Sequence, residues 1–341
     1  MTTYRSVMAT RHGQADVLQV VENDLRPPEA GEVRIKVLAA SVSGPDVAHR
    51  TGDTLYTGTP MAKNKPPFVP GYSIIGDVDA VGTDVENVAV GDRVGVLTIV
   101  GGYSEYLYWS SNWLIPVPES VDPVDAVTLI LNYIVAYQAL HRTAKVKAGE
   151  IMLIVGASGG IGTALLQLGQ LADLKMYGLA SERKHRVLCD YGAIPIDYHA
   201  QHFAEVLRQA EPDGIDIVMD GMSRMAIIRN GLSLLRHGGR VVSFGDPRHL
   251  LVLLQMLMTM VTVNLLPNNK SFKLYGTSRY VLGDKQPFLN DWTTLFGMLE
   301  SGKIKPVITD VLPILEAAEA NRLLESGCVT GNVVLAAPEL L

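Results

Sequence analysis

The hydrophobic and polar positions of the chain follow two different patterns, and the first of them fills roughly the first 120 residues. Short alternating or wholly apolar runs are separated there by glycine, proline and other turn residues, as in EVRIKVLAASV, GYSIIGDVDAVG, GDRVGVL and YSEYLYW. Runs of this length and spacing predict short β-strands joined by turns. We therefore expect a small, irregular, partly barrel-like β domain.

The second pattern begins at Pro123, where DAVTLILNYIVAYQALHRTAKV has helical apolar spacing and Asp122 can cap the first turn. Strand-like and helix-like runs then alternate. We expect strands at Ile151–Val155, Met176–Leu179, Ile215–Met219 and Arg240–Phe244, with helices from Gly160, near Arg183–Asp190 and near Met225–Leu235. Alternation of this kind predicts an α/β fold with a doubly wound parallel sheet and crossover helices.

The strand-like texture returns from about Lys273, where GKIKPVITDVLPILEAAEANRLLESGCVTGNVVL predicts a strand, a helix and a strand. A chain of 341 residues is longer than one hydrophobic core usually fills, which favours two domains. We therefore expect one domain to be built from residues 1–123 and 274–341. A nucleotide-binding domain, residues 124–273, is expected to be inserted between these two segments.

Composition excludes several classes of protein. The net charge is −6 and no stripe of lysine and arginine occurs, so a nucleic-acid partner is not expected. Two cysteines, Cys189 and Cys328, cannot form a disulfide framework or a four-cysteine zinc site. The first residues, MTTYRSVMATRHG, lack the apolar core of a signal peptide, so we expect a cytoplasmic protein.

One apolar segment raises the question of association with a membrane. The run LLVLLQMLMTMVTVNLL, residues 250–266, carries no charged residue. It is shorter than the about 20 residues of a membrane-spanning helix, and it contains Gln255, Asn264 and threonines. We expect a buried helix at a domain or subunit interface, and association with a membrane surface is the alternative.

The segment GASGGIG follows the expected strand Ile151–Val155 and opens a helix. Its glycines, at positions 156, 159, 160 and 162, leave room for a ligand to approach backbone N–H groups at the positive end of the helix dipole. This arrangement suits the pyrophosphate of a dinucleotide. We therefore expect a phosphate-binding loop that includes Ser158, Gly159, Gly160 and Ile161.

The same letters fit the G-x-S-x-G pattern of serine hydrolases, in which Ser158 would be the nucleophile. Asp220 and either His237 or His249 would complete the triad. The oxyanion-type HGG at His237 follows the serine, however, whereas in lipases it precedes it. The segment before the loop is also the glycine- and proline-rich β region rather than several strands of a parallel sheet. The phosphate-binding interpretation is favoured for these reasons.

The residues after the second strand of this unit indicate which nucleotide binds. A site for NAD carries Asp or Glu there, about 20 residues past the loop, to hold the ribose hydroxyls. Here the sequence has Ala180 and Ser181, then Glu182, Arg183 and Lys184. A hydroxyl and two cations suit a 2′-phosphate, and cations at a helix start are otherwise mildly unfavourable. We therefore expect NADPH rather than NADH as the cofactor.

The motifs PGYSIIGDVDAVG, GDRV, NYIVAYQAL, GASGGIG, GKIKPVI and GNVVL, in this order, resemble the medium-chain dehydrogenase/reductase superfamily along almost the whole chain. Within it, the chain resembles the zinc-free quinone oxidoreductases, and NNKSFKLYGTSRY with the apolar stretch before it resembles the vesicle amine transport protein-like branch. The resemblance implies a Rossmann domain inserted in a GroES-like domain. It also implies a homodimer in which the sheets of two nucleotide domains join edge to edge.

The zinc enzymes of this superfamily carry Cys-His-x-Asp in the first domain and Gly-His-Glu after the proline. The matching segments here are SGPD at residues 43–46 and GYS at residues 71–73. Because the thiolate and imidazole ligands are missing, no zinc site is expected. His199 and His202 form an H-x-x-H pair, which we interpret as solvated surface residues because no third ligand accompanies them.

Without zinc, a substrate must be activated by its own conjugation, as in a quinone or an α,β-unsaturated ketone. Hydrogen-bond donors must then stabilise the negative charge that develops on the carbonyl oxygen. The resemblance places the catalytic groups at Ser43, where related reductases often have asparagine, and at Tyr56. A tyrosine is neutral at pH 7 and can donate the proton.

The resemblance also implies the contacts of the cofactor. Ser158, Gly159, Gly160 and Ile161 would lie at the pyrophosphate; Ser181, Lys184 and Tyr198, with Arg183, would hold the adenosine phosphate; Phe244 and Gly245 would lie near the nicotinamide; Asn132 would line the cleft; and Asn332 stands where relatives often carry lysine. Two other functions stay open. One is a membrane-associated NADPH-binding protein with little turnover. The other is an enoyl-thioester reductase, whose basic pocket would draw on Arg50, Lys63 and Lys65.

Overall fold

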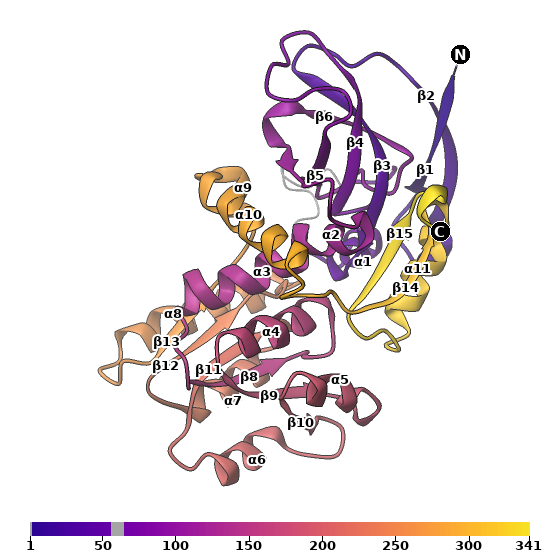
Figure 1. Ribbon diagram of the computed structural model, residues 1–341. Coiled ribbons are helices and arrows are strands. Elements are labelled where there is room, and N and C mark those ends of the chain that lie inside the picture. The colour runs from indigo at the N-terminus through magenta and orange to yellow at the C-terminus, as the bar shows by residue number, and fades with distance from the viewer. Residues whose placement is uncertain (1, 56–64) are drawn as a thin grey trace. The chain divides into compact units, whose positions relative to one another are not determined.

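The computed structural model describes residues 2–55 and 65–341, and the chain divides into two compact units (Figure 1). Unit 1 comprises Met1–Leu131 and Leu289–Leu341, and unit 2 comprises Asn132–Phe288. The sequence pattern places the two boundaries earlier, after residues 123 and 273. Helix α2 (Pro123–Thr128) accounts for the first difference, because it starts at the expected proline but packs on strands of unit 1.

Unit 1 is built on an open, mostly antiparallel sheet. Its strands are β1 (Thr3–Ala9), β2 (Leu18–Asp24), β3 (Glu32–Val42), β4 (Ser73–Val81), β5 (Arg93–Leu97), β6 (Tyr106–Ser110), β7 (Ile115–Pro116), β14 (Ile308–Pro313) and β15 (Asn332–Ala336). Seven of them form one sheet in the order β14-β15-β3-β4-β5-β7, with β6 also paired to β3, while β1 pairs with β2. Its helices are α1 (Gly44–Thr51), α2 and α11 (Ala317–Glu325), and α10 (Gln286–Glu300) crosses the boundary at residue 288.

Strand β15 brings the far end of the chain into the middle of this sheet. It runs antiparallel to β3, with Val333 opposite Val42, and parallel to β14. All five of its residues are buried. The alternate residues Val33, Ile35 and Val37 of β3 are buried in the same core, so both segments of unit 1 share one hydrophobic interior.

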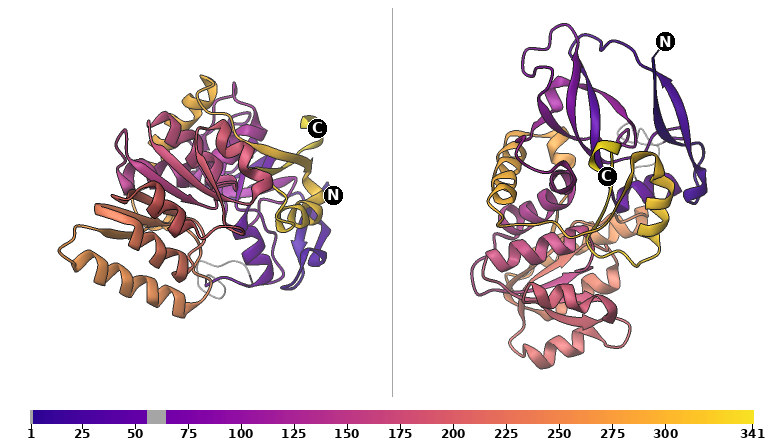
Figure 2. Two further views of the ribbon diagram at one scale, coloured as in Figure 1. Left: turned by 90° about the horizontal axis from the view of Figure 1, so that it is seen from below. Right: turned by 45° about the vertical axis from the view of Figure 1, so that its right-hand side comes forward.

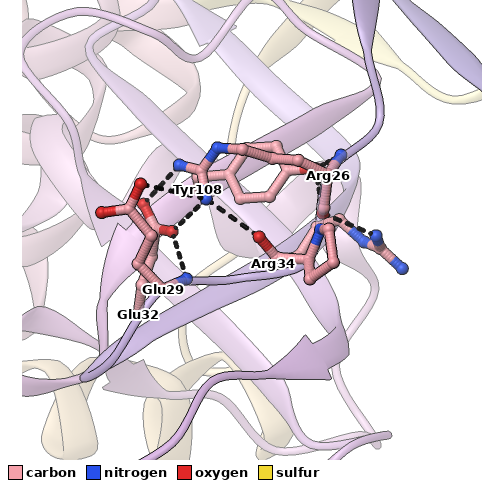
Figure 3. Close-up of polar contacts among 6 residues, drawn as sticks. Arg26, Glu29, Glu32, Arg34 and Tyr108 are labelled. Atoms are coloured by element: carbon pink, nitrogen blue, oxygen red, sulfur yellow. Dashed lines mark hydrogen bonds and ion pairs between the residues drawn. The ribbon is translucent and has the colours of Figure 1, made fainter.

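A cluster of ion pairs and ring contacts joins β6 to the chain between β2 and β3 (Figure 3). The guanidinium of Arg26 pairs with Glu32 at 2.6 Å and lies 4.1 Å from the centre of the Tyr108 ring. The Tyr108 hydroxyl accepts the Arg26 N–H at 2.8 Å and donates to the Arg26 carbonyl oxygen at 2.7 Å. This side chain therefore completes two backbone hydrogen bonds that the sheet does not provide.

The variant Tyr108→Phe is expected to lose about 1–2 kcal/mol of unfolding free energy, because it removes both hydrogen bonds and keeps the ring. Urea unfolding of the full chain measures this loss. Tyr106→Phe, on the same strand, is the matched control, since its hydroxyl has no hydrogen bond to residues 2–55 or 65–341. Equal losses in the two variants would contradict the prediction.

Unit 2 contains the predicted doubly wound parallel sheet. Its strands are β8 (Ile151–Val155), β9 (Lys175–Ala180), β10 (Ile194–Asp197), β11 (Ile215–Asp220), β12 (Leu235–Ser243) and β13 (Ser271–Leu274), and its helices are α3 (Ile134–Tyr137), α4 (Gly160–Leu171), α5 (His185–Asp190), α6 (Phe203–Ala210), α7 (Met225–Leu234), α8 (Leu250–Leu265) and α9 (Ser278–Leu282). All pairs in the order β10-β9-β8-β11-β12-β13 are parallel. The strand order reverses beside β8, and ligands of such sheets bind outside the carboxyl ends of the strands at this point.

Helices cover both faces of this sheet, as right-handed crossovers require. Helix α4 packs beside α3, whereas α7 packs against α6 and α8 (Figure 1). The strands between them are buried; every residue of β11 is buried, and so are four of the five residues of β8. This fixed scaffold determines where each loop at the carboxyl edge leaves the sheet.

Two apolar helical stretches differ in their burial. Among the described residues, the helical stretch Pro123–Ala144 is long and apolar enough to cross a membrane, but 83% of its most apolar window is buried. Helix α8, in contrast, lies at the periphery of unit 2 (Figure 2, left), and Met256 is its one buried residue. The uncharged sequence predicts a buried helix here, but the chain by itself buries only the face that carries Met256.

Candidate functional site

The glycine loop of unit 2 connects β8 to α4 by a turn that excludes side chains. Gly156 has φ +80°, a conformation that glycine adopts without strain. A Cβ atom on Gly162 would overlap the carbonyl oxygen of Gly156 and lie 2.6 Å from the carbonyl carbon of Ala157. The first turn of the helix therefore packs directly on the loop, and this approach is possible only because residue 162 has no side chain.

The same turn presents hydrogen-bond donors for an anion. Helix α4 begins at Gly160 after the cap residue Gly159, and its first N–H groups have no acceptor within the helix. No acidic residue occurs in its first turn, so the positive end of the helix dipole is not neutralised there. Ser158 is half-buried beside this turn. The loop thus has the space and the donors that a dinucleotide pyrophosphate needs.

The hydrolase alternative does not agree with this geometry. Asp220 ends β11, and its carboxylate already accepts the N–H groups of Met222 and Ser223 and the hydroxyl of Ser243. His237 is near the start of β12 and so lies toward the amino ends of the parallel strands, whereas the glycine loop leaves the carboxyl end of β8. The carboxylate of Asp220 is therefore committed to these donors, and His237 is not placed to activate a serine at position 158.

Four residues predicted to hold the adenosine phosphate lie at the carboxyl ends of β9 and β10. Ala180 and Asp197 are opposite each other in the parallel register, so Ser181 and Tyr198 follow at neighbouring positions. Arg183 and Lys184 belong to the short 3₁₀ turn that starts after Ser181. The structure therefore brings a hydroxyl, two cations and a half-exposed aromatic ring to one corner of the sheet.

Two acidic residues, Asp197 and Glu182, also lie at this corner. The carboxylate of Asp197 accepts the His199 N–H at 3.0 Å and shapes its own turn. Glu182 is exposed in the first turn of the 3₁₀ segment. Neither position is the last residue of β9, from which an acid reaches a ribose in NAD-binding sites.

The loops after β11 and β12 form a second fixed element at the carboxyl ends of the strands, and the sequence predicts only part of it. Phe244 and Gly245 were predicted near the nicotinamide, and the Phe244 N–H donates to the Asp220 carbonyl at 2.9 Å. The Ser223 hydroxyl donates to the Gly245 carbonyl at 2.7 Å. A Cβ atom on Gly245 would lie 2.5 Å from the carbonyl oxygen of Gly221, so the two loops are in direct contact.

Asp220 organises both loops, whereas the G-x-S-x-G pattern suggests for it only the role of a hydrolase acid. Burial raises the pKa of this carboxyl, while the hydrogen bonds from Ser243, Met222 and Ser223 act in the opposite direction. The sequence signal for this role is an acid at the last position of a buried parallel strand. Position alone, however, does not reveal which donors the carboxylate will receive.

In unit 1, Ser43 and Asp46 form a capping box at the start of α1. The Ser43 N–H and hydroxyl both donate to one oxygen of Asp46, at 2.8 and 2.6 Å, and the Gly71 N–H donates to the other at 3.1 Å. Thr98 in turn donates to the Gly71 carbonyl. The Ser43 proton is thus directed at Asp46, which leaves the lone pairs of the hydroxyl oxygen for another partner.

Asp46 is completely buried, and this burial raises the pKa of its carboxyl to about 6 against the opposing hydrogen bonds. The folded state therefore retains a proton that the unfolded chain, with a pKa near 3.8, releases between about pH 4 and pH 6. Stability from this group is present below pH 4 and is lost as the pH rises through 6. At 1.36 kcal/mol for each pKa unit the loss is about 3 kcal/mol.

The variant Asp46→Asn has no titrating group at this position and is therefore expected to lack this decline between pH 4 and pH 6. Urea unfolding at a series of pH values measures the slope. Asp213→Asn, an exposed position of unit 2, is the control and should keep it. A wild-type chain whose stability rises steadily with pH, and in parallel with that of Asp46→Asn, would contradict the assignment.

Three predicted residues remain: Tyr56, Asn132 and Asn332. Tyr56 lies outside the described residues. Asn132 is buried in the π-helical stretch Leu129–Tyr133. Asn332 begins β15, is buried, and donates its side-chain amide to the Val307 carbonyl at 2.8 Å. That amide therefore holds the entry of β15 within unit 1.

Two family matches cover separate parts of the chain. Residues 29–119 match the alcohol dehydrogenase GroES-like domain, and residues 192–335 match a zinc-binding dehydrogenase family. The quinone oxidoreductase of Sus scrofa is 30% identical over 336 residues, which are 97% of each chain. The chain belongs to the medium-chain dehydrogenase/reductase superfamily. It is therefore an oxidoreductase of that superfamily, with a nicotinamide cofactor and a small-molecule substrate.

Further similarities extend across the superfamily. The synaptic vesicle membrane protein VAT-1 homolog of Rattus norvegicus is 30% identical over 97% of this chain and 83% of its own length. Among solved structures, the CurF ER cyclopropanase from the curacin A biosynthetic pathway has a TM-score of 0.85 and 26% identity, with coverage of 98% of this chain and 99% of that chain. These matches confirm the predicted combination of a GroES-like and a Rossmann-like domain.

The residues at the superfamily's zinc positions serve hydrogen bonds within unit 1 in this member. Ser43 and Asp46 bind each other, and the Ser73 hydroxyl lies 2.7 Å from that of Ser41. Within residues 2–55 and 65–341, no group of three or more His, Cys, Asp or Glu side chains is placed to hold a metal ion. The two histidines of the H-x-x-H pair are exposed, and His202 lies 4.0 Å from Glu205.

Proposed function

We propose that this oxidoreductase is an NADPH-dependent reductase of quinones or α,β-unsaturated carbonyl compounds that works without zinc. The observation that carries the choice of NADPH is the corner after β9 and β10. Ser181, Arg183 and Lys184 follow one strand there, and Tyr198 follows its neighbour. A 2′-phosphate carries close to two negative charges, which a hydroxyl and two cations can bind.

The residues of unit 2 would bind the rest of the cofactor. The backbone of Ser158 to Ile161 would hold the pyrophosphate at the start of α4, where a side chain at residue 162 would close the loop. Phe244 and Gly245, fixed through Asp220 and Ser223, would border the nicotinamide with Asn132. When bound, the nicotinamide supplies a hydride.

The residue types at the superfamily's zinc positions support this choice of substrate class. SGPD at residues 43–46 and GYS at residues 71–73 offer hydroxyls and a buried carboxylate instead of thiolate and imidazole. A simple alcohol or aldehyde depends on a Lewis acid, whereas a quinone or enone is already activated by conjugation. Ser43 would orient the substrate or the ribose, and Tyr56 would donate the proton to the reduced substrate.

The enoyl-thioester alternative has less support from the described residues. Arg50 is fully buried, with its guanidinium on Glu325 at 2.6 Å and on Asn321 at 3.2 Å, so this cation is committed within unit 1. Lys63 lies outside the described residues, and Lys65 is exposed. A basic pocket for phosphopantetheine would therefore have to form without Arg50.

The test is steady-state oxidation of NADPH by the purified chain with a panel of quinones, enones and one enoyl thioester. We expect turnover with quinones or enones and none with a saturated aldehyde. A rate equal to background with every acceptor, together with tight NADPH binding, would instead support a binding protein with little turnover. The proposal keeps the predicted cytoplasmic location, which cell fractionation tests, and the predicted homodimer.

A further inference from the structure

Two cations of unit 2 hold the end of one helical stretch. The π-helical segment η4 (Gln138–Ala144) ends there, and the last carbonyl groups of a helix have no partner within it. The ammonium of Lys273 donates to the Thr143 carbonyl at 2.9 Å, and the guanidinium of Arg240 donates to the Ala144 carbonyl at 2.6 Å. Both side chains are therefore fixed at one point beside the sheet.

The strand register places these two cations on the same face of the sheet. Arg240 of β12 is opposite Ser271 of β13, and Val242 is opposite Lys273. Partners in register lie on one face, as do residues two apart on a strand, so Arg240 and Lys273 extend in the same direction. Lys145, the residue directly after η4, adds a third cation whose positive charge acts on Lys273.

One carboxylate is paired with these cations. Glu150 accepts both terminal nitrogens of Arg240, at 2.9 and 2.6 Å, and the backbone N–H of Lys147 at 2.9 Å. We call Lys145, Glu150, Arg240 and Lys273 the lysine cluster. With both lysines protonated, its three cations and one carboxylate leave an excess of two positive charges.

Lys273 is the member of the lysine cluster that these surroundings make nucleophilic. Its side chain is half-buried, and burial together with the positive charges of Arg240 and Lys145 lowers the pKa of its ammonium. A larger fraction of this amine is therefore neutral at a given pH than for an unperturbed lysine, and the neutral form carries the reactive lone pair. The hydrogen bond to Thr143 holds its nitrogen in place.

We propose that Lys273 is a site of reversible modification by carbon dioxide, which its amine binds as a carbamate facing Arg240 and Lys145. The nitrogen lone pair forms the N–C bond, one C=O electron pair of carbon dioxide moves onto oxygen, and the nitrogen releases one proton to solvent. One N–H stays on the nitrogen for the Thr143 carbonyl. The carbamate and Glu150 then balance the two remaining cations of the lysine cluster.

The charge of the product distinguishes carbon dioxide from an acylating agent. An acyl group also consumes the neutral amine, but the amide that it forms is uncharged and leaves Arg240 and Lys145 without a new partner. A carbamate is an anion, and hydrogen bonds between charged groups are the stronger ones. The unfolded chain lacks the lysine cluster, so carbon dioxide stabilises the folded state.

The experiment equilibrates the full chain with ¹³C-labelled bicarbonate, detects the carbamate carbon by NMR, and locates it by trapping with triethyloxonium and peptide mass spectrometry. We expect the label on Lys273 of the wild-type chain and its loss in Lys273→Arg, which keeps the positive charge and a donor for Thr143. Lys270→Arg is the matched control, because Lys270 is also half-buried and donates to a carbonyl, that of Leu232, at 3.4 Å. This control should keep the label.

A second variant tests the cations rather than the amine. Lys145→Gln keeps Lys273 but removes one partner of the carbamate, so the affinity for carbon dioxide should fall about 10-fold, whereas Lys147→Gln should not change it. At constant pH and ionic strength, carbon dioxide should raise the melting temperature of the wild-type chain but not that of Lys273→Arg. A wild-type chain without label on Lys273, or with equal label on its exposed lysines, would overturn the proposal, and so would an unchanged affinity in Lys145→Gln.

Discussion

Replacing Gly162 with alanine is expected to destabilise unit 2 by about 3 kcal/mol, because the new methyl group cannot avoid the loop. It would overlap the Gly156 carbonyl oxygen and meet two further backbone atoms of Ala157. Backbone atoms cannot move aside as the end of a flexible side chain can, so α4 must shift away from β8. The affinity for NADPH should fall by roughly 100-fold, or about 2.7 kcal/mol, since the shift removes the N–H groups from the pyrophosphate.

Gly159→Ala is the matched control for this result. A Cβ atom there would lie 3.6 Å from the Gly156 carbonyl oxygen, which is an ordinary contact, and the backbone is extended with φ −82°. Its melting temperature should equal that of the wild-type chain, so any loss of NADPH binding would come from the methyl group in the loop itself. Thermal unfolding and fluorescence titration measure the two effects separately. A Gly162→Ala chain with wild-type stability and affinity would refute the role of this loop.

Replacing Lys184 with alanine is expected to weaken NADPH binding by roughly 10- to 100-fold, the effect of losing a hydrogen bond between charged groups, about 1.5–3 kcal/mol. The affinity for NADH should change little, because NADH lacks the phosphate that this cation would bind. Isothermal titration with both nucleotides gives the ratio directly. Salt should reduce the difference between the two affinities, since part of the attraction is between exposed charges.

Arg186→Ala tests whether any lost cation at this corner has the same effect. Arg186 is exposed on α5, two residues after Lys184, and it is not among the residues that follow β9 directly. Its loss should leave the preference for NADPH unchanged. Equal losses of NADPH and NADH affinity in Lys184→Ala would show that this residue supports the fold of the corner rather than the choice of cofactor.

Much of unit 2 could be predicted from periodicity because its strands are short, apolar and bounded by turn residues. Ile151–Val155 was predicted with both ends correct, and Ile215–Met219 differs from β11 by one residue. Strands β10 and β13 were not foreseen. Each is four residues long, and IPID and SFKL lack the continuous apolar character of the inner strands because they border the sheet.

The candidate site likewise combines residues that the sequence predicts with residues that it does not. The glycine loop could be predicted from its sequence, because a backbone that a ligand must approach closely requires residues without side chains. Asp220 could not, because its role depends on the donors that two loops bring to it. The exposure of α8 was also beyond prediction. A helix that is apolar on every side has no polar stripe to show which face meets solvent.

The position of β15 between β14 and β3 has a consequence for how the protein is made. During synthesis the ribosome releases all of unit 2 before residues 332–336 emerge. Domains fold as units while the chain lengthens, so the nucleotide-binding part can be complete when unit 1 still lacks an inner strand. Until then β3 must leave one edge open over Ala39 to Val42, and a nascent chain is most open to wrong pairing at that edge.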